Sequence, residues 1–259
     1  INLEMEKKLK GHPYVKSPID MACWDIIGKY YKMPVWKLLG GKFGEKIELY
    51  RAISQETPEE MVRKVKMYLK EGYSKFQLKV GGDYLEDIER MIEVRSILNE
   101  EDILIADANT GWLMHDALKV LKKTQHLDIY YEQPCETYDE CLQIRNKTNN
   151  PFILDESIDS MSNFLKAYND NAMDIINIKI SKLGGLTKSK QLRDLCVELN
   201  IPMTIEDSWG GDIATSAITH LAHSTPAKYR FSSTDFNSYN SISYTEGSPK
   251  RIDGKTEAS

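Results

Sequence analysis

The chain has 259 residues, of which 28% are charged and 41% are hydrophobic, and its formal net charge is −5. This composition is typical of a soluble globular protein and excludes a disordered or collagen-like chain. The acidic balance argues against nucleic acid or anionic lipid as a partner, and no apolar run approaches the roughly 20 residues that cross a bilayer. Residues 1–10 also lack the apolar stretch of a signal peptide. We therefore expect a cytoplasmic protein without membrane or nucleic-acid partners.

The N-terminal segment has helical signals and no strand. Ser17-Pro18-Ile19-Asp20 is expected to open a helix that continues through MACWDIIGKYY and is followed by PVWKLLGG. Residues 1–44 are therefore interpreted as the tail of a preceding helical domain, or as a helix that closes the base of a barrel. The chain begins with Ile rather than Met and ends in a short polar stretch, which suggests a fragment of a longer protein.

Short runs rich in Ile, Val, Tyr and Phe then alternate with amphipathic segments of helical length. One of these segments has a Thr57 N-cap, Pro58 at N1 and Glu60 at N3. The alternation predicts eight parallel strands in βα units, hence an α/β protein with a (β/α)8 barrel over residues 45–245 and a C-terminal segment at 246–259. A doubly wound sheet is the alternative, but no Gly-x-Gly-x-x-Gly follows the first strand. The strands are expected at residues 47–54, 74–80, 102–108, 129–133, 152–156, 175–180, 202–208 and 229–236.

Seven of these strands carry a polar residue near the C-terminal end. Because equivalent ends of consecutive parallel strands meet at one mouth of a barrel, these residues are expected to form one site. Side chains alternate faces along a strand, so Lys75, Gln77 and Lys79 share a face, as do Asn177 and Lys179. The residues at the strand ends are Lys79, Asp107, Glu132, Asp155, Lys179, Asp207 and Asp235.

Asp107, Glu132 and Asp155 lie on three consecutive strands and offer the hard oxygen donors that Mg²⁺ takes. The alternative for each acid is that it caps the helix after its strand. Glu156 has the opposite parity to Asp155 and is a second choice for the third ligand. Zinc is disfavoured because no His lies on these strand ends. His220 and His223 are interpreted as surface or packing residues, and the four scattered cysteines as reduced thiols.

Lysines before and after the three acidic strands suggest proton abstraction next to a metal-bound carboxylate. A lysine acts as a base only when it is neutral part of the time, and desolvation and a nearby cation both lower a lysine pKa from about 10.4. Two such lysines permit racemisation or epimerisation, and they also permit β-elimination of water. Metal-dependent hydrolysis or phosphoryl transfer on the same barrel, or a catalytically silent barrel, are the alternatives from other classes.

Five motifs together resemble the enolase superfamily and, within it, the mandelate racemase/muconate lactonizing enzyme group, in the branch with a lysine on each side. The resemblance runs from about Pro13 to Ile252. It implies one Mg²⁺ held by Asp107, Glu132 and Asp155, acid/base roles for Lys79 and Lys179, and a structural or electrostatic role for Lys182. It also implies a small-molecule carboxylate or amino-acid substrate and a possible homo-oligomer. The motifs are KFQLKVGGD (75–83), DANTGW (107–112), YYEQP (130–134), LDES (154–157) and NIKISKLGG (177–185).

One feature argues against a particular branch of the family, and two departures from the family pattern matter. The seventh strand reads MTIEDSWGGD without the His base of the mandelate racemase branch proper. Gln77 stands where the lysine branch commonly has a first lysine, which removes one cation near Lys79; Lys75 could compensate but lies deeper. The α+β capping domain that precedes the barrel in the family is absent, so we expect weak or no activity if the chain is complete.

The stretches TIEDSWGGD (204–212) and STDFNSY (233–239) are similar to members of the group that act on proline derivatives. The resemblance implies dehydration of cis-3-hydroxy-L-proline, or epimerisation of proline betaine, hydroxyproline betaine or another amino-acid derivative. Asp207 and Asp235 could pair with a substrate ammonium, and Trp112 and Trp209 could contact it through cation–π interactions or else pack the loops. Gln77 and Asn109 complete the candidate substrate contacts.

Overall fold

The computed structural model describes residues 1–258. The chain separates into two compact units, one made of Ile1–Leu49 with Asn177–Ser259 and the other of Tyr50–Ile176. Each unit is described by itself below. The domain boundaries expected from the sequence, at residues 44 and 245, stay a prediction.

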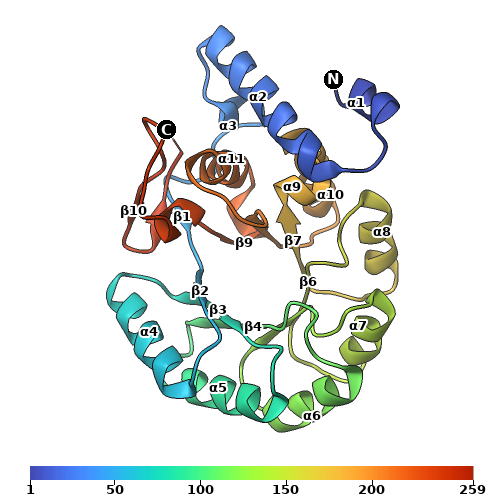
Figure 1. Ribbon diagram of the computed structural model, residues 1–259, viewed down its shortest axis with the longest axis vertical. Coiled ribbons are helices and arrows are strands. Elements are labelled where there is room, and N and C mark those ends of the chain that lie inside the picture. Colours follow the sequence, from blue (N-terminus) through green and yellow to red (C-terminus); the bar gives the residue numbers. More distant parts are fainter. Residues whose placement is uncertain (259) are drawn as a thin grey trace. The chain divides into compact units, whose positions relative to one another are not determined.

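The unit formed by Tyr50–Ile176, called the central unit below, consists of strands that alternate with helices. Its strands pair in parallel in chain order, and its helices lie on the outer side of the strands (Figure 1). The chain order of the elements is β2 (Arg51–Ile53), α4 (Pro58–Lys70), β3 (Lys75–Lys79), α5 (Tyr84–Ser96), β4 (Ile103–Asp107), α6 (Met114–Thr124), β5 (Tyr130–Glu132), α7 (Tyr138–Arg145), β6 (Phe152–Leu154) and α8 (Met161–Asn169), followed by the start of β7 (Ile175–Lys179).

Local signals in the sequence explain where these helices begin. Thr57 accepts a hydrogen bond from the Glu60 backbone N–H at 3.4 Å, so the expected N-cap of α4 is confirmed. Thr137 and Glu140 form a capping box at the start of α7. Asp83 caps α5 by accepting from two backbone N–H groups. The helices therefore start close after each strand, which keeps the connecting loops short.

Strand register brings polar residues to one level of the sheet. Lys79 is the partner of Asp107 across β3 and β4, and Asp107 is the partner of Glu132 across β4 and β5. The preceding residues on these strands, Leu78 and Ala106, are apolar and fully buried. At the ends of these strands, apolar side chains therefore face the helices and polar side chains face the opposite side.

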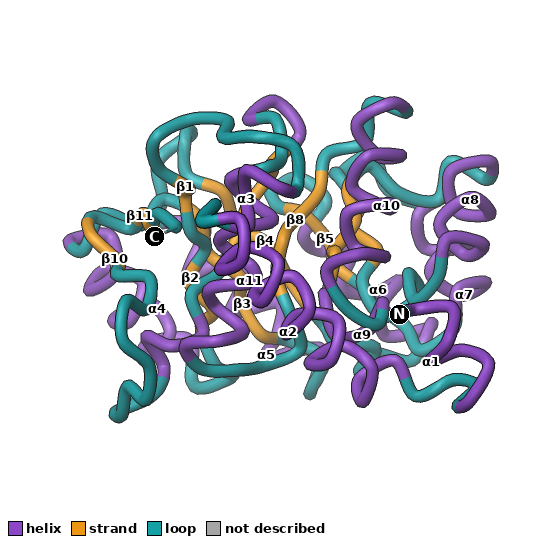
Figure 2. Tube along the Cα trace, turned by 90° about the horizontal axis from the view of Figure 1, so that it is seen from above, coloured by secondary structure: helices purple, strands orange, loops and turns teal. Residues whose placement is uncertain are grey.

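The other unit contains the N-terminal helices and the last strands. β8 and β9 pair in parallel with an irregularity between Met203 and Thr204, and the short strands β10 and β11 form an antiparallel sheet with β1 (Figure 2). Its elements are α1 (Asn2–Lys8), α2 (Pro13–Tyr31), α3 (Val35–Leu38), β1 (Ile47–Glu48), α9 (Ile180–Leu183), α10 (Leu186–Glu198), β8 (Met203–Glu206), α11 (Asp212–His223), the 3-10 helices η1 (Ala227–Tyr229) and η2 (Phe236–Tyr239), β9 (Arg230–Ser233), β10 (Arg251–Ile252) and β11 (Lys255–Thr256).

The eight strands β2 to β9 follow the chain order in one sheet, so the expected (β/α)8 class is confirmed. The single strand expected at 47–54 is wrong, because it is two strands. β1 pairs with β11, and the chain then changes sheets at Leu49 and Tyr50 before β2 pairs with β3. The Leu49 N–H is bonded to the Gly254 carbonyl at 2.9 Å, which holds this change of sheet in place.

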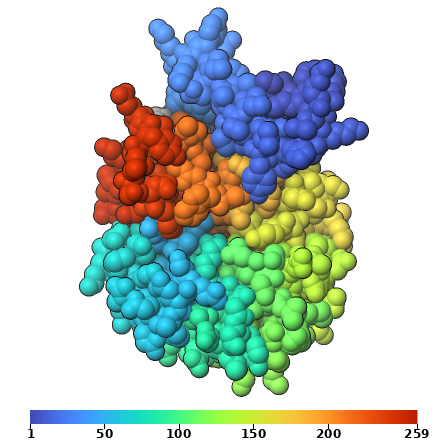
Figure 3. All heavy atoms as spheres, in the orientation of Figure 1, coloured from blue at the N-terminus to red at the C-terminus, as the bar shows by residue number. Residues whose placement is uncertain are grey.

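The helix start expected at Ser17-Pro18 is also wrong, because α2 begins at Pro13 and contains Pro18 in its interior. Pro13 takes the N1 position that favours proline. Asp20 on α2 is buried and accepts from the Thr187 backbone N–H at 2.9 Å, whereas Ile26 and Tyr30 on the same helix are exposed apolar side chains. Figure 3 shows this N-terminal segment in blue. No helix within residues 1–258 is long and apolar enough to cross a membrane.

His223 is a buried, unpaired histidine on α11. Neither ring nitrogen has a hydrogen-bond partner among the described residues, and the side chain is fully buried. Burial lowers the pKa of His223 to about 4, and the cations of Lys42 and Arg230 act in the same direction. The expectation that His220 and His223 pack rather than bind metal agrees with this burial.

We predict that His223 makes the protein acid-sensitive. Between pH 6.5 and pH 4 the unfolded chain binds a proton at His223 that the folded chain excludes, so stability falls as the pH falls through this window. Urea unfolding of His223→Leu between pH 7 and pH 4 is expected to show a loss smaller than that of the wild type by on the order of 2 kcal/mol. His126→Leu, at an exposed position, serves as control and should retain the wild-type slope. Parallel slopes for wild type and His223→Leu would contradict the prediction.

Candidate functional site

The central unit brings four of the expected site residues together at the ends of β3, β4 and β5. The Lys79 ammonium forms an ion pair with Asp107, whose side chain is fully buried. The Gln77 amide donates to both carboxylate oxygens of Glu132, at 3.2 Å each. The face shared by Gln77 and Lys79 is therefore the one that carries the carboxylates, as strand parity predicts.

Asn109 extends this cluster into the loop after β4. Its side-chain oxygen accepts from Lys79 Nζ at 2.9 Å, and its side-chain nitrogen donates to Glu156 Oε1 at 3.1 Å. The Asn109 backbone N–H also donates to Asp107 at 2.9 Å, and the residue adopts φ +43°. Asn109 thus connects the β4 loop with the β6 loop, which makes Glu156 a member of the same hydrogen-bonded cluster as Lys79.

Asp155 is held in place through Gln133, a residue that the sequence reasoning did not single out. Gln133 is fully buried, and its side-chain oxygen accepts from the backbone N–H groups of Asp155 at 3.1 Å and Ser157 at 3.2 Å. Its side-chain nitrogen donates to Ser157 Oγ at 2.8 Å and to the Cys135 carbonyl at 3.2 Å. Gln133 directly follows Glu132 in the chain. It therefore ties the loop after one candidate ligand to the loop that carries another.

The donor set fits a hard divalent cation in its chemistry. Asp107, Glu132 and Asp155 are buried carboxylates on neighbouring strands, and buried carboxylates need cations or hydrogen-bond donors to be stable. The arrangement is not that of a formed metal cluster, since within residues 1–258 no three His, Cys, Asp or Glu side chains are grouped as a metal site. Burial raises the pKa of Cys135 to about 11 and of Cys141 to about 12, so both neighbouring thiols are protonated at neutral pH.

In the other unit, Lys179 at the end of β7 lies 3.8 Å from Glu206 Oε1 at the end of β8. Both side chains are mostly buried, at 16% and 3% exposure. Glu206 was not expected from the sequence, where the adjacent Asp207 was chosen. The parity of β8 could have identified it, because Thr204 and Glu206 share one face of that strand.

Asp207 is engaged by backbone and hydroxyl groups. It is 1% exposed and accepts from Ser181 N at 3.0 Å, Ser181 Oγ at 2.8 Å and Ser208 N at 2.7 Å. Burial raises the pKa of Asp207, although these hydrogen bonds and Lys179 act to lower it. Asp207 thus accepts hydrogen bonds from the first turn of α9, the short helix that precedes its own strand. Pairing of Asp207 with a substrate ammonium stays a prediction.

Asp235 is also buried, at 2% exposure, and lies 3.8 Å from Arg251 Nη1. Lys182 is 9% exposed, in keeping with the structural role that the family motif implies. Pairing of Asp235 with a substrate ammonium and a structural or electrostatic role for Lys182 both stay predictions.

The two tryptophans expected near the substrate differ in exposure. Trp112 is 3% exposed, and its Nε1 donates to Asp87 at 2.8 Å, which favours the alternative that it packs a loop. Trp209 is 60% exposed and forms an aromatic cluster with Phe236, at 5.3 Å between ring centroids, and Tyr239, at 5.7 Å. Trp209 is therefore the accessible candidate for a cation–π contact.

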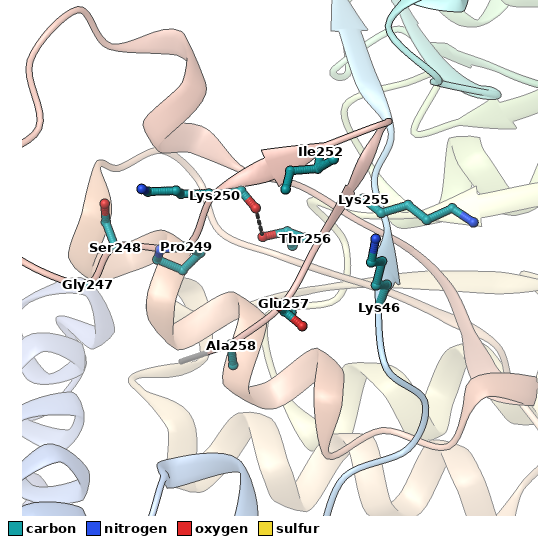
Figure 4. A pocket seen from close by; sticks show the side chains of 10 residues that line it. All are labelled: Lys46, Gly247, Ser248, Pro249, Lys250, Ile252, Lys255, Thr256, Glu257 and Ala258. Carbon is teal, nitrogen blue, oxygen red and sulfur yellow. Dashed lines mark hydrogen bonds between the residues drawn. The ribbon is translucent and has the colours of Figure 1, made fainter.

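A cavity of about 260 Å³ lies beside the β10–β11 hairpin (Figure 4). Lys46, Lys250 and Ile252 are among the residues that line it, and Thr256 Oγ1 donates to the Lys250 carbonyl at 3.0 Å on one side. None of the candidate site residues lines this cavity. The cavity is thus separate from the carboxylates and lysines described above.

Two family descriptions match the chain. "Enolase C-terminal domain-like" matches residues 60–259, which is well over half of the chain, and "Mandelate racemase / muconate lactonizing enzyme, N-terminal domain" matches residues 1–40. The chain belongs to the mandelate racemase/muconate lactonizing enzyme group of the enolase superfamily. The resemblance seen in the sequence motifs is therefore confirmed.

Individual relatives of this group include a dehydratase and racemases. The chain is 54% identical over 259 residues to the cis-3-hydroxy-L-proline dehydratase of Roseibium aggregatum, covering 100% of the chain and 71% of the relative. It is 31% identical over 224 residues to the N-succinyl-L-Arg/Lys racemase of Bacillus cereus, covering 85% of the chain and 61% of the relative. The chain thus spans between about three fifths and seven tenths of the length of these relatives.

Solved structures from the same group share the fold. An enolase superfamily member from Roseovarius nubinhibens, complexed with magnesium, aligns with a TM-score of 0.94 at 35% identity and covers 100% of this chain and 71% of its own. A mandelate racemase/muconate lactonizing enzyme from the same organism gives a TM-score of 0.94 at 38% identity, covering 100% and 72%. The α/β barrel class and the enzyme superfamily therefore rest on both sequence and structure.

We predict that Gln133 is needed to hold the Asp155 loop. Gln133→Ala leaves the buried N–H groups of Asp155 and Ser157 without acceptors and opens a cavity, so the free energy of unfolding is expected to fall by about 2–4 kcal/mol. Urea unfolding followed by circular dichroism measures the loss. The matched control is Gln125→Ala at the exposed end of α6, which should change stability by less than about 0.5 kcal/mol. Equal losses in the two variants would contradict the assignment.

Proposed function

We propose that this protein abstracts the α-proton of a small amino-acid carboxylate in a Mg²⁺-dependent reaction, and that its reaction is the dehydration of cis-3-hydroxy-L-proline. The observation that carries the substrate is the 54% identity, over the whole chain, to a dehydratase of that name. The chemistry is supported by the strand register, which places Lys79, Asp107 and Glu132 side by side on three neighbouring strands.

In this proposal Asp107, Glu132 and Asp155 hold the metal. Mg²⁺ bound there would stabilise the negative charge that develops on the substrate carboxylate when the α-proton leaves. The support from this chain is the donor chemistry of three buried carboxylates. Magnesium in a solved member of the same superfamily supports the choice of ion.

Lys79 and Lys179 are proposed as the acid/base pair. The hydroxyl of cis-3-hydroxy-L-proline is cis to the carboxyl group, so the α-hydrogen lies on the opposite ring face from the hydroxyl. One lysine removes the α-proton and the other donates a proton to the departing hydroxyl, which leaves as water. The C2–C3 double bond formed in this way gives an enamine that tautomerises to a cyclic imine. A lysine for each face thus suits this substrate.

Epimerisation of an amino-acid derivative is the second candidate, and it is favoured by the racemase and epimerase relatives. It uses the same two lysines, since one removes the proton and the other returns a proton on the far face. The exposed Trp209 in its aromatic cluster supports a cationic substrate group for both candidates, because a ring face attracts an ammonium by about 0.5–2 kcal/mol.

We predict that the two lysines are each essential for turnover. With cis-3-hydroxy-L-proline and Mg²⁺, the wild type is expected to release water and form the cyclic imine, measured by ¹H NMR. Lys79→Met and Lys179→Met should each lower the rate 10²- to 10⁴-fold. Lys66→Met, at an exposed position of α4, is the control and should keep the wild-type rate.

Proton exchange by the same variants in D₂O distinguishes the candidates, with cis-3-hydroxy-L-proline and a betaine tested as separate substrates. Deuterium at the α-carbon of both enantiomers of a betaine, without loss of a hydroxyl group, would replace dehydration by epimerisation. Full turnover and full α-proton exchange in both lysine variants would contradict the proposed chemistry altogether.

We predict that the three carboxylates bind Mg²⁺ as a set. Glu132→Gln and Asp155→Asn should each weaken Mg²⁺ binding more than tenfold, because each removes a charged oxygen donor. Isothermal titration calorimetry measures the affinity. Asp128→Asn is the control, since that side chain is 68% exposed and pairs only loosely with Arg95, at 3.7 Å. Unchanged affinity in both site variants would refute the assignment of these ligands.

A further inference from the structure

Asp87 is a buried carboxylate on α5 that accepts five hydrogen bonds. One of its oxygens accepts from the backbone N–H groups of Gly81 at 2.9 Å and Gly82 at 3.0 Å, and from Trp112 Nε1 at 2.8 Å. Its side chain is 0% exposed. Gly81 and Gly82 belong to the loop after β3, and Trp112 belongs to the loop after β4. One carboxylate oxygen therefore joins two loops that follow neighbouring strands.

The other oxygen of Asp87 connects to the loop after β2. Arg90 Nη1 donates to it at 2.8 Å and Gln55 Nε2 at 3.4 Å. Arg90 also donates through Nε to the Glu56 carbonyl at 2.7 Å. The Arg90 side chain is 8% exposed, so Asp87 and Arg90 form a buried ion pair. Buried pairs of this kind are costly to break, because the remaining charge loses its partner.

The joined loops are also in direct backbone contact. Gly81 has φ +98°, and a Cβ there would overlap the Ala108 carbonyl oxygen; a Cβ on Gly111 would overlap the Gly81 carbonyl oxygen. The Val80 N–H is bonded to the Asp107 carbonyl at 3.0 Å. A displacement of the β3 loop therefore moves the β4 loop with it, and these two loops follow Lys79 and Asp107.

We propose that Asp87 is a positioning residue that fixes the loops after β3 and β4 and, through them, the relative placement of Lys79 and Asp107. This inference rests on the proposed function, because it assigns Lys79 and Asp107 to the reaction. Asp87 itself lies under the loops and touches no candidate reacting group. Its role is to hold catalytic geometry, where a displacement of about 1 Å costs on the order of 10² in rate.

Asp87→Asn tests this proposal in the full-length protein. Asn has nearly the same size, but its single acceptor oxygen cannot serve both edges of the carboxylate, so donors of one edge face an amide NH₂. With saturating Mg²⁺ and cis-3-hydroxy-L-proline, kcat per folded molecule is expected to fall 10- to 100-fold while KM changes less than threefold. A purely structural role would lower the unfolding temperature and leave kcat per folded molecule unchanged, which would overturn the proposal.

Glu86→Gln is the matched control, because Glu86 also binds Arg90, at 2.7 Å, but is exposed on the same helix. It should keep kcat within twofold of the wild type. If Asp87→Asn does not fold, Trp112→Phe removes one donor and keeps the ring. A three- to tenfold fall in kcat in that variant supports the proposal, and an unchanged kcat overturns it. If Lys79→Met is active, the proposed function is refuted. If Lys79→Met is inactive but Asp87→Asn is fully active, only the positioning role is refuted.

Discussion

The burial of carboxylates at the carboxyl ends of neighbouring parallel strands is the constraint on which the central unit depends. Asp107, Glu132 and Asp155 are each removed from water, and such groups are stable only where donors or cations replace the lost hydration. Lys79 and Gln77 supply part of that replacement from the adjacent strand. The loops in turn are built around buried hydrogen-bonding side chains, Gln133 and Asp87, which fix the backbone near the carboxylates.

The ion pair between Lys79 and Asp107 both supports and opposes the proposed chemistry. It holds the ammonium beside the carboxylates, whereas the proposed proton abstraction needs an amine with a free lone pair. Gln77 contributes hydrogen bonds to Glu132 and no positive charge. In the proposed function a divalent cation held by the carboxylates would compete with Lys79 for Asp107.

The sequence predicted the parts of this protein that depend on periodicity and missed those that depend on long-range contacts. Alternation along the strands placed Gln77 and Lys79 on the face of the carboxylates, and the capping signal at Thr57 located α4. The split at Leu49 was missed because β1 pairs with a strand about two hundred residues further along the chain. The roles of Gln133 and Asp87 were missed because most of their partners lie on other loops, and these partners include backbone N–H groups that no side-chain pattern reveals.

The contact between the glycines of the β3 and β4 loops has a consequence for protein engineering. Neither the β3 loop at Gly81 nor the β4 loop at Gly111 has room for a side chain. The two loops therefore pack against each other only while both positions are glycine. A graft that exchanges one of them for the corresponding stretch of a homologue with a bulkier residue would force the other out of place. Swaps intended to alter substrate preference at this edge should therefore transplant both segments together, with the helix residue that anchors them.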